Sequence, residues 1–153
     1  MIQALNRVNQ LRQIFNEQET FAFYQGKTMG GCFIGLFAKR KILDRIKDLY
    51  VCKVKAGMGG LTKNKGSVAL RFKIDDTTFA FFNCHLSAGK GEVEKRAEML
   101  RMILDHAFKK AKGLYKAANH DVIYIFGDLN FRIDLKNKEA REAIQADNID
   151  FLK

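Results

Sequence analysis

The chain has 153 residues, of which 47% are hydrophobic, and this composition excludes a disordered polypeptide. The length suits one domain with a core of its own and leaves little room for a second domain. Lysine and arginine number 27 against 17 aspartate and glutamate, a net charge of +10 that favours phosphorylated metabolites, anionic lipid headgroups or nucleic acid as partners. A solvated basic surface without such a partner is the alternative explanation.

Cysteine usage and hydropathy bear on the compartment. The cysteines are Cys32, Cys52 and Cys84; they form no C-x-x-C pair, and their odd number argues against a disulfide framework. No apolar run approaches the roughly 18 residues that a membrane-spanning helix needs, and the first ten residues lack the apolar core of a signal peptide. We therefore expect a cytoplasmic protein with reduced cysteines and no transmembrane segment.

The first half of the chain is predicted to consist mainly of strands. Apolar residues recur at helical spacing in the first eighteen residues, which predicts an amphipathic helix there. Strands are predicted at 20–25, 32–39 and 46–55, with a turn between the first two. A loop rich in glycine and lysine follows at 56–66. Apolar and polar residues then alternate over 67–74, and two aspartates predict a hairpin turn into a strand at 77–86.

The second half is predicted to contain two helices separated by a strand. The long helix runs from about Glu92 to Lys112, and its apolar stripe comprises Val93, Ala97, Leu100, Ile103, Leu104, Ala107 and Phe108. The run DVIYIF at 121–126 predicts a buried strand, and 136–147 predicts a closing helix. This order of elements predicts an α/β (α+β) layered sandwich of mixed, mainly antiparallel sheets with outer helices, rather than a doubly wound parallel sheet.

Two common phosphate-binding motifs are not supported. The stretch GMGGLTKNKGS contains no G-x-x-x-x-G-K-[ST], so a nucleotide P-loop is not predicted. The stretch CHLSAGK has Lys90 where a cysteine-phosphatase loop needs arginine, and lysine does not supply the fork geometry of a guanidinium. Cys84 is therefore predicted to be an ordinary strand residue.

Three polar segments adjoin the predicted strands: Asn64-Lys65-Gly66, the stretch HLSAG at 85–89 and the stretch GDLNFR at 127–132. If their strands are neighbours, these segments meet at one rim of a sheet. Such a rim suits phosphate chemistry, because glycine-loop amides and lysine attract phosphates. A carboxylate there orients a water, and a histidine exchanges protons near neutral pH.

Individual residues at this rim each have a structural alternative. Asp128 is a candidate for holding the attacking water, directly or with a divalent ion, and Asn130 offers amide donors to a phosphoryl oxygen. His85 is a candidate donor to the phosphate or to a leaving oxygen, and Lys65 would attract further phosphates. Alternatively, Asp128 and Asn130 form an Asx-turn after a strand, His85 is a structural histidine, and the lysine loop is a solvated turn.

The segments GDLNFR, NCHLSAG and GLTKNKGSVALRF resemble the inositol polyphosphate 5-phosphatases, a family of the exonuclease–endonuclease–phosphatase superfamily. The likeness runs from about Phe21 to the C-terminus and includes GLFAKRKI and EVEKRAEML. The resemblance implies a metal-dependent enzyme that removes the 5-phosphate from phosphoinositides or soluble inositol polyphosphates. It further implies a two-sheet sandwich with the site at the rim, and Mg²⁺ as cofactor.

Matched residue by residue, the resemblance implies specific roles. Asp128 orients the attacking water, while Asn130 and His85 contact the scissile phosphate. The residues expected on the substrate-binding side are Asn64, Lys65, Lys90 and Arg132, of which Arg132 supports the site loop. The resemblance also places Met58 and Leu61 near the bilayer, which implies peripheral contact with an anionic membrane at its cytosolic face.

The chain also departs from the family pattern. The glutamate of a Q-E motif is a principal metal ligand in the family, but NEQE at 16–19 lies directly before the first strand, so its role is not carried over. The family's P-x-W-C-D-R and S-D-H segments do not occur. We therefore expect residues 1–153 to be a central portion of the catalytic domain, incomplete at both ends. The metal ligands are then unknown, apart from Asp128 as a candidate.

Two competing hypotheses remain. The first is a phosphoinositide-binding module with the same fold and basic rim but no turnover. The second is a nuclease of the same superfamily, which would need a groove for nucleic acid. The stretches SAGKG and KNKG supply positive charge but no aromatic stacking platform, so nucleic acid is not expected as a partner.

Overall fold

The computed structural model describes residues 6, 9–11, 13–14, 21–57, 62–111, 115–133 and 135–147, with the backbone alone at 62 and 63. The strands are β1 (Phe21–Met29), β2 (Cys32–Lys39), β3 (Ile46–Gly57), β4 (Thr62–Ile74), β5 (Thr77–His85) and β6 (Val122–Asp128). The helices are α2 (Val93–His106) and α3 (Asn137–Gln145), and the 3-10 turns are η1 (Arg40–Arg45) and η3 (Ala117–Asn119). No helix within these ranges is long and apolar enough to cross a membrane.

The strands form two sheets. Strands β1 and β2 pair as an antiparallel hairpin, and the second sheet has the order β3-β4-β5-β6. Strands β3, β4 and β5 run antiparallel to their neighbours, whereas β6 runs parallel to β5. A parallel neighbour requires a crossover connection, and α2 lies within it. The mixed, mainly antiparallel α+β sandwich expected from the sequence is confirmed.

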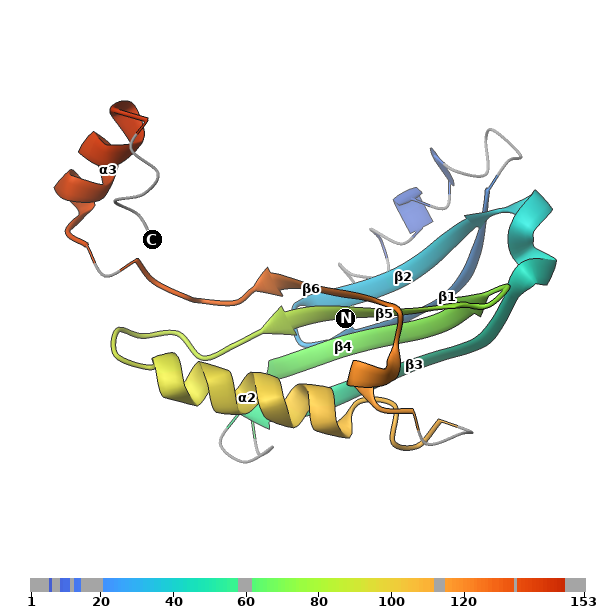
Figure 1. Ribbon diagram of the computed structural model, residues 1–153. Coiled ribbons are helices and arrows are strands. Elements are labelled where there is room, and N and C mark those ends of the chain that lie inside the picture. The colour runs from blue at the N-terminus through green and yellow to red at the C-terminus, as the bar shows by residue number, and fades with distance from the viewer. Residues whose placement is uncertain are drawn as a thin grey trace.

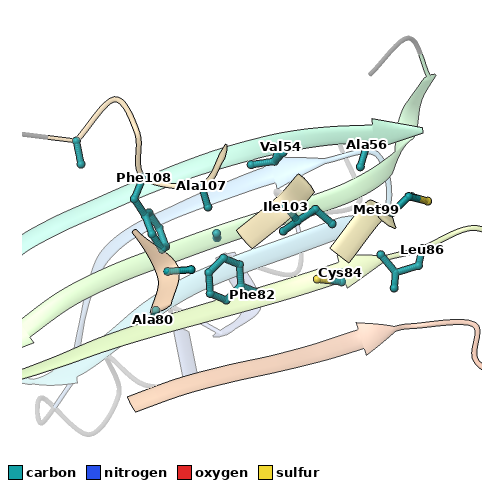
Figure 2. Close-up of a cluster of buried hydrophobic side chains, with 13 residues drawn as sticks. Val54, Ala56, Ala80, Phe82, Cys84, Leu86, Met99, Ile103, Ala107 and Phe108 are labelled. Carbon is teal, nitrogen blue, oxygen red and sulfur yellow. The ribbon is translucent and has the colours of Figure 1, made fainter. Parts of the chain in front are cut away.

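The four-stranded sheet separates two hydrophobic clusters, because successive residues of a strand point to opposite faces. On one face, Val68 and Leu70 of β4 pack with Met29 and Ile34 of the β1–β2 hairpin. On the other face, Phe82 packs with residues of α2 and with Phe108, whose ring centroid is 5.5 Å away. Figure 2 shows this second cluster between the sheet and the helix. The molecule is thus layered as hairpin, sheet and helix (Figure 1).

A buried arginine network stabilises the end of the sheet where β6 begins. The side chain of Arg71 is 1% exposed, and its Nε donates to Nε2 of His120 at 2.9 Å. Nη1 donates to the carbonyl of Asp48 at 2.8 Å, and the guanidinium carbon lies 3.5 Å from the ring centroid of Tyr115. This network attaches the segment before β6 to the centre of the sheet.

Several element boundaries differ from the sequence prediction. Strand β4 begins at Thr62, so the lysine-rich segment expected as a loop lies in the strand. The turn between β1 and β2 is only Gly30–Gly31, because β1 continues to Met29. Helix α2 ends at His106 rather than Lys112. Of the predicted first helix, residues 6, 9–11 and 13–14 are helical, and its remainder lies outside the described residues.

Two burial predictions were wrong. Val93 is 48% exposed, and the side chains of α2 buried against the sheet are those of Arg96, Met99 and Ile103. The DVIYIF run was expected to be a buried strand, but four of its apolar side chains are between 37% and 54% exposed: Ile123, Tyr124, Ile125 and Phe126. The reason is position, because β6 is an edge strand of its sheet among the described strands and α2 packs mainly against β3 and β4 on the other side of the sheet.

Candidate functional site

The register of the sheet brings the three polar segments together. Gly66 on β4 pairs with His85 on β5, and His85 in turn pairs with Asp128 on β6. The last residues of β5 and β6 therefore lie beside the first half of β4, at the end of the sheet toward which β5 and β6 point in Figure 1. The convergence expected from the sequence is confirmed at this rim.

Lys65 contacts the histidine of the rim directly. Its Nζ lies 2.7 Å from Nε2 of His85 and donates to the carbonyl of Leu86 at 2.9 Å. A lysine ammonium has donors but no acceptor, so Nε2 of His85 accepts this bond and its proton resides on Nδ1. The imidazole is half-buried in this arrangement.

Asp128 and Asn130 form a tight turn at the end of β6. The backbone N–H of Asn130 donates to Oδ1 of Asp128 at 3.2 Å, and Asn130 has a φ of 55°. Asparagine tolerates this left-handed conformation better than most residues. The Asx-turn alternative is thus correct as a description of the backbone. It leaves Oδ2 of Asp128 3.7 Å from Nε2 of His85, so the turn also fixes the direction of the carboxylate.

The carbonyl of Leu86 connects the three segments. It accepts hydrogen bonds from Nζ of Lys65 at 2.9 Å and from Nδ2 of Asn130 at 3.0 Å. The backbone N–H of Leu86 donates to the carbonyl of Asp128 at 3.0 Å. Both backbone polar groups of this one residue are therefore used to hold neighbouring site residues in place.

Gly127 allows β6 to approach β5 closely at the site. Its φ is +112°, and an added Cβ would lie 2.5 Å from Oδ1 of Asn83 and closer to the Cys84 carbonyl oxygen than the sum of their van der Waals radii. Asn83 in turn donates from Nδ2 to the carbonyl of Phe33 in β2 at 2.9 Å. A glycine before Asp128 is therefore required by packing, which the sequence motif alone did not explain.

The remaining predicted substrate-binding residues are less closely connected. Arg132 donates from Nη2 to Oδ1 of Asn130 at 3.5 Å, a long hydrogen bond consistent with a supporting position. Asn64 and Lys90 are exposed and make no hydrogen bond or ion pair with another described residue. Their expected roles stay predictions. Met58, Leu61 and the NEQE stretch lie outside the described residues.

Cys32 is a site neighbour that sequence reasoning missed. Burial raises the pKa of its thiol, the carboxylate of Asp128 raises this pKa further, and the ammonium of Lys65 lowers it. These influences place Cys32, at the start of β2, within electrostatic reach of the rim. No spacing in the sequence signalled this, because β2 belongs to the other sheet. All three cysteines are free, as expected, and Cys84 is buried in β5.

The described side chains do not form a complete metal centre. No group of three or more histidine, cysteine, aspartate or glutamate residues in this part of the chain is arranged to hold an ion. Asp128 offers one carboxylate, with Oδ2 not hydrogen-bonded to the turn. A hard divalent cation binds through several oxygen ligands, so Asp128 alone supplies part of such a site.

Comparison with known proteins identifies relatives over almost the whole chain. The sequence matches the Endonuclease/Exonuclease/phosphatase family 2 over residues 3–153. It is 34% identical to synaptojanin of Caenorhabditis elegans and 31% identical to synaptojanin-1 of Homo sapiens, in each case over 144 residues or 94% of the chain. The chain spans only 12% and 9% of the length of these two curated relatives.

A solved structure shares the fold. It is the inositol polyphosphate 5-phosphatase domain of SpSynaptojanin in complex with inositol (1,4)-bisphosphate and calcium ion. The two structures superpose with a TM-score of 0.79 at 27% sequence identity, and the match covers 93% of this chain and 42% of that chain.

Proposed function

Because the chain belongs to the Endonuclease/Exonuclease/phosphatase family 2, we propose that residues 1–153 carry part of an inositol polyphosphate 5-phosphatase catalytic domain. The reaction is hydrolysis of the 5-phosphate of a phosphoinositide or a soluble inositol polyphosphate. The observation that supports it most is the meeting of Lys65, His85, Asp128 and Asn130 at one end of the sheet. The likeness to synaptojanins and to a 5-phosphatase domain with a bound inositol bisphosphate supports the substrate class.

Each residue then has a definite task in the proposed reaction. The ammonium of Lys65 turns from Nε2 of His85 to a phosphate oxygen of the substrate, which frees the imidazole. After the freed Nε2 of His85 takes up a proton from solvent, His85 and the amide of Asn130 donate to the scissile phosphate. Oδ2 of Asp128 accepts a proton from the attacking water. The water oxygen bonds to phosphorus, the bond from phosphorus to the inositol oxygen breaks, and this oxygen leaves as a hydroxyl with a proton from His85.

A divalent cation belongs to this proposal. The structural relative was solved with calcium, and we propose Mg²⁺ as the cofactor with Asp128 as one of its ligands. Such an ion would neutralise charge on the phosphoryl oxygens. The described residues hold no group of three or more histidine, cysteine, aspartate or glutamate residues arranged for an ion, so the further ligands of the cation are not assigned.

The positive charge of the chain and of Lys65 favours a second candidate, a phosphoinositide-binding module without turnover. Lys65 and the net charge of +10 suffice to attract an inositol phosphate, because binding requires cations and donors but no activated water. In either case we propose a cytoplasmic location, with peripheral contact to anionic membrane through the basic surface. Nucleic acid is not proposed as a partner.

Phosphate release and binding separate the two candidates. Inositol 1,4,5-trisphosphate is supplied with Mg²⁺, release is followed by malachite green, and binding is measured by isothermal titration calorimetry. Phosphate release above a no-enzyme control supports the phosphatase. Saturable binding without release supports the module, and neither release nor binding contradicts both.

Variants then test the site if turnover is found. Asp128→Asn keeps an oxygen for the Asn130 N–H but removes the carboxylate charge, and we expect at least about a hundredfold loss of kcat with binding retained. Asp105→Asn, on the exposed face of α2, is the matched control and should behave like wild type. Lys65→Met should weaken binding about tenfold or more, since a charged hydrogen bond is lost. Unchanged kcat in Asp128→Asn would contradict the assignment.

A further inference from the structure

Arg96 occupies an unusual place for a charged residue. It lies in the first turns of α2, and its side chain is fully buried, with 0% exposure. No carboxylate among the described residues pairs with it, and its Nε has no hydrogen-bond partner there. Burying an arginine without a counter-ion is unfavourable unless its donors are used elsewhere.

The donors of Arg96 are directed at the loop that follows β5. Nη1 donates to the carbonyl of Gly89 at 3.0 Å and to the carbonyl of Ser87 at 3.3 Å. The hydroxyl of Ser87 also donates to the sulfur of Met99, one turn further along α2, at 3.2 Å. Helix α2 thus holds the backbone of residues 87–89 through a charged side chain and through a second, weaker contact.

The same guanidinium also contacts the loop after β6. Its Cζ lies 5.2 Å from the ring centroid of Phe131, a cation–π distance. Phe131 directly follows Asn130, whose amide bonds to the carbonyl of Leu86. Arg96 therefore contacts both loops. Its partner Ser87 directly follows Leu86, and its partner Phe131 directly follows Asn130.

From these contacts we infer that Arg96 is a positioning residue, which holds the 87–89 loop and the 129–132 loop in the mutual arrangement that the proposed active site requires. The expected effect of Arg96 on turnover rests on the proposed function, whereas its effect on the arrangement of the two loops does not. Arg96 makes no hydrogen bond or ion pair with His85 or Asp128 among the described contacts, and it acts through the backbone of residues 87–89 and the ring of Phe131. Its unpaired charge additionally raises the electrostatic potential of the rim toward phosphate.

Amide exchange tests the structural content directly. The reporter is the backbone N–H of Leu86, which bonds to Asp128 across the two loops, measured by NMR hydrogen exchange. In Arg96→Met, exchange at Leu86 should be at least about tenfold faster than in wild type, since hydrogen bonds from a charged donor are worth that factor or more. The exchange rates of amides in the second half of α2 should be unchanged. In Arg96→Lys, which has one ammonium in place of the forked guanidinium, the exchange rate at Leu86 should lie between those of wild type and Arg96→Met.

The control variant is Arg101→Met, an exposed position on the same helix. It should leave both Leu86 and α2 unchanged. Unchanged exchange at Leu86 in Arg96→Met would overturn the inference, as would equal acceleration along α2, because the side chain would then merely stabilise the helix. If Arg96→Met does not fold, Arg96→Lys decides: faster exchange at Leu86 supports the inference and a wild-type rate overturns it.

Turnover of inositol 1,4,5-trisphosphate gives the catalytic readout. Arg96→Met should lower kcat about tenfold or more, because misplacement of catalytic groups lowers turnover, with a smaller change in KM and partial rescue in Arg96→Lys. If the wild-type chain neither binds nor hydrolyses the substrate, the proposed function fails while the exchange result still decides the role of Arg96. If wild type is active and kcat of Arg96→Met is unchanged, the positioning role fails alone.

Discussion

Replacing Gly127 by alanine places a methyl group inside the contact between β5 and β6. The added carbon lies 2.5 Å from Oδ1 of Asn83, 2.9 Å from the nitrogen of Cys84 and closer still to the Cys84 carbonyl oxygen. Unstrained contacts between non-bonded heavy atoms lie at about 3.5 Å or more, so β6 must retreat by about 1 Å. Two of the obstructing atoms belong to the backbone of the neighbouring strand, which cannot turn aside as a flexible side chain would.

The expected destabilisation has two parts. A φ of +112° is unfavourable for alanine by about 1–3 kcal/mol. The retreat of β6 weakens ladder hydrogen bonds next to Cys84, at about 1 kcal/mol each. We expect Gly127→Ala to lower the free energy of unfolding by about 3–5 kcal/mol, a large fraction of the stability of a domain of this size.

Two other glycines separate these contributions. Gly91 has a φ of +71° but nothing within 4 Å of an added Cβ, so Gly91→Ala reports the backbone term alone, about 1–2 kcal/mol. Gly31 has neither a positive φ nor a close neighbour, so Gly31→Ala should stay within about 0.5 kcal/mol of wild type. Urea denaturation followed by far-UV circular dichroism measures all three variants. If Gly127→Ala is no less stable than Gly91→Ala, the close approach of the two strands is refuted.

Phe82→Ala should lower the free energy of unfolding by about 3–5 kcal/mol in the same urea experiment, because Phe82 is fully buried beneath α2; a loss under 1 kcal/mol would contradict the core assignment. The hydroxyl and amide of Thr78 donate to Asp121 and lower the pKa of its carboxyl. The stabilisation that ionised Asp121 gives the folded state is thus present above the ordinary aspartate pKa of about 3.9, and it is lost as pH falls through the lower pKa of the folded state. Asp121→Asn should therefore flatten the decline of melting temperature below about pH 4, and an unchanged profile would contradict this. Burial raises the pKa of the Cys84 and Cys32 thiols, so iodoacetamide should label both cysteines of the native protein slowly at pH 8, and Cys84 more slowly than Cys32. Labelling is followed by mass spectrometry, and rapid labelling of Cys84 would show that β5 is accessible.

The positions of the site residues could be predicted from sequence because the relevant strands are regular. Alternation over 67–74 and 77–86, with an aspartate turn between, specifies one hairpin register. An apolar run ending in Gly127 and Asp128 specifies the end of a third strand. Once those strands are neighbours, residues at their ends must lie together, whatever the rest of the fold does.

The buried arginines could not be predicted in this way. Hydrophobic periodicity assigns a charged residue to the exposed face of a helix. Arg96 is nevertheless buried, because two backbone carbonyls accept its hydrogen bonds and an aromatic ring contacts its guanidinium. Arg71 is likewise buried by His120 and Tyr115, which lie more than forty residues away in the sequence. Burial of this kind depends on partners that only the tertiary structure brings together.

The exposure of β6 escaped prediction for a related reason. A continuous apolar run is typical of a strand covered on both faces, and it says nothing about how many neighbouring strands are present. The position of a strand within its sheet follows from topology, and the crossover through α2 leaves β6 on the outside. Local sequence therefore predicted the strand but not its surroundings.

The parallel pairing of β5 with β6 also has a consequence for the order in which the protein folds. Strands β4 and β5 are joined by a two-residue turn, so their pairing requires closure of a very short loop. The hydrogen bond from Thr78 to Asp121 at the start of β6 spans 43 residues, and closing so long a loop loses much more chain entropy. Contacts between residues distant in sequence form slowly, so we expect β6 to dock after the β3–β4–β5 meander. The carboxylate of Asp128 then reaches His85 only in this late step, and chains that have completed the meander but not the docking have a core without an assembled site.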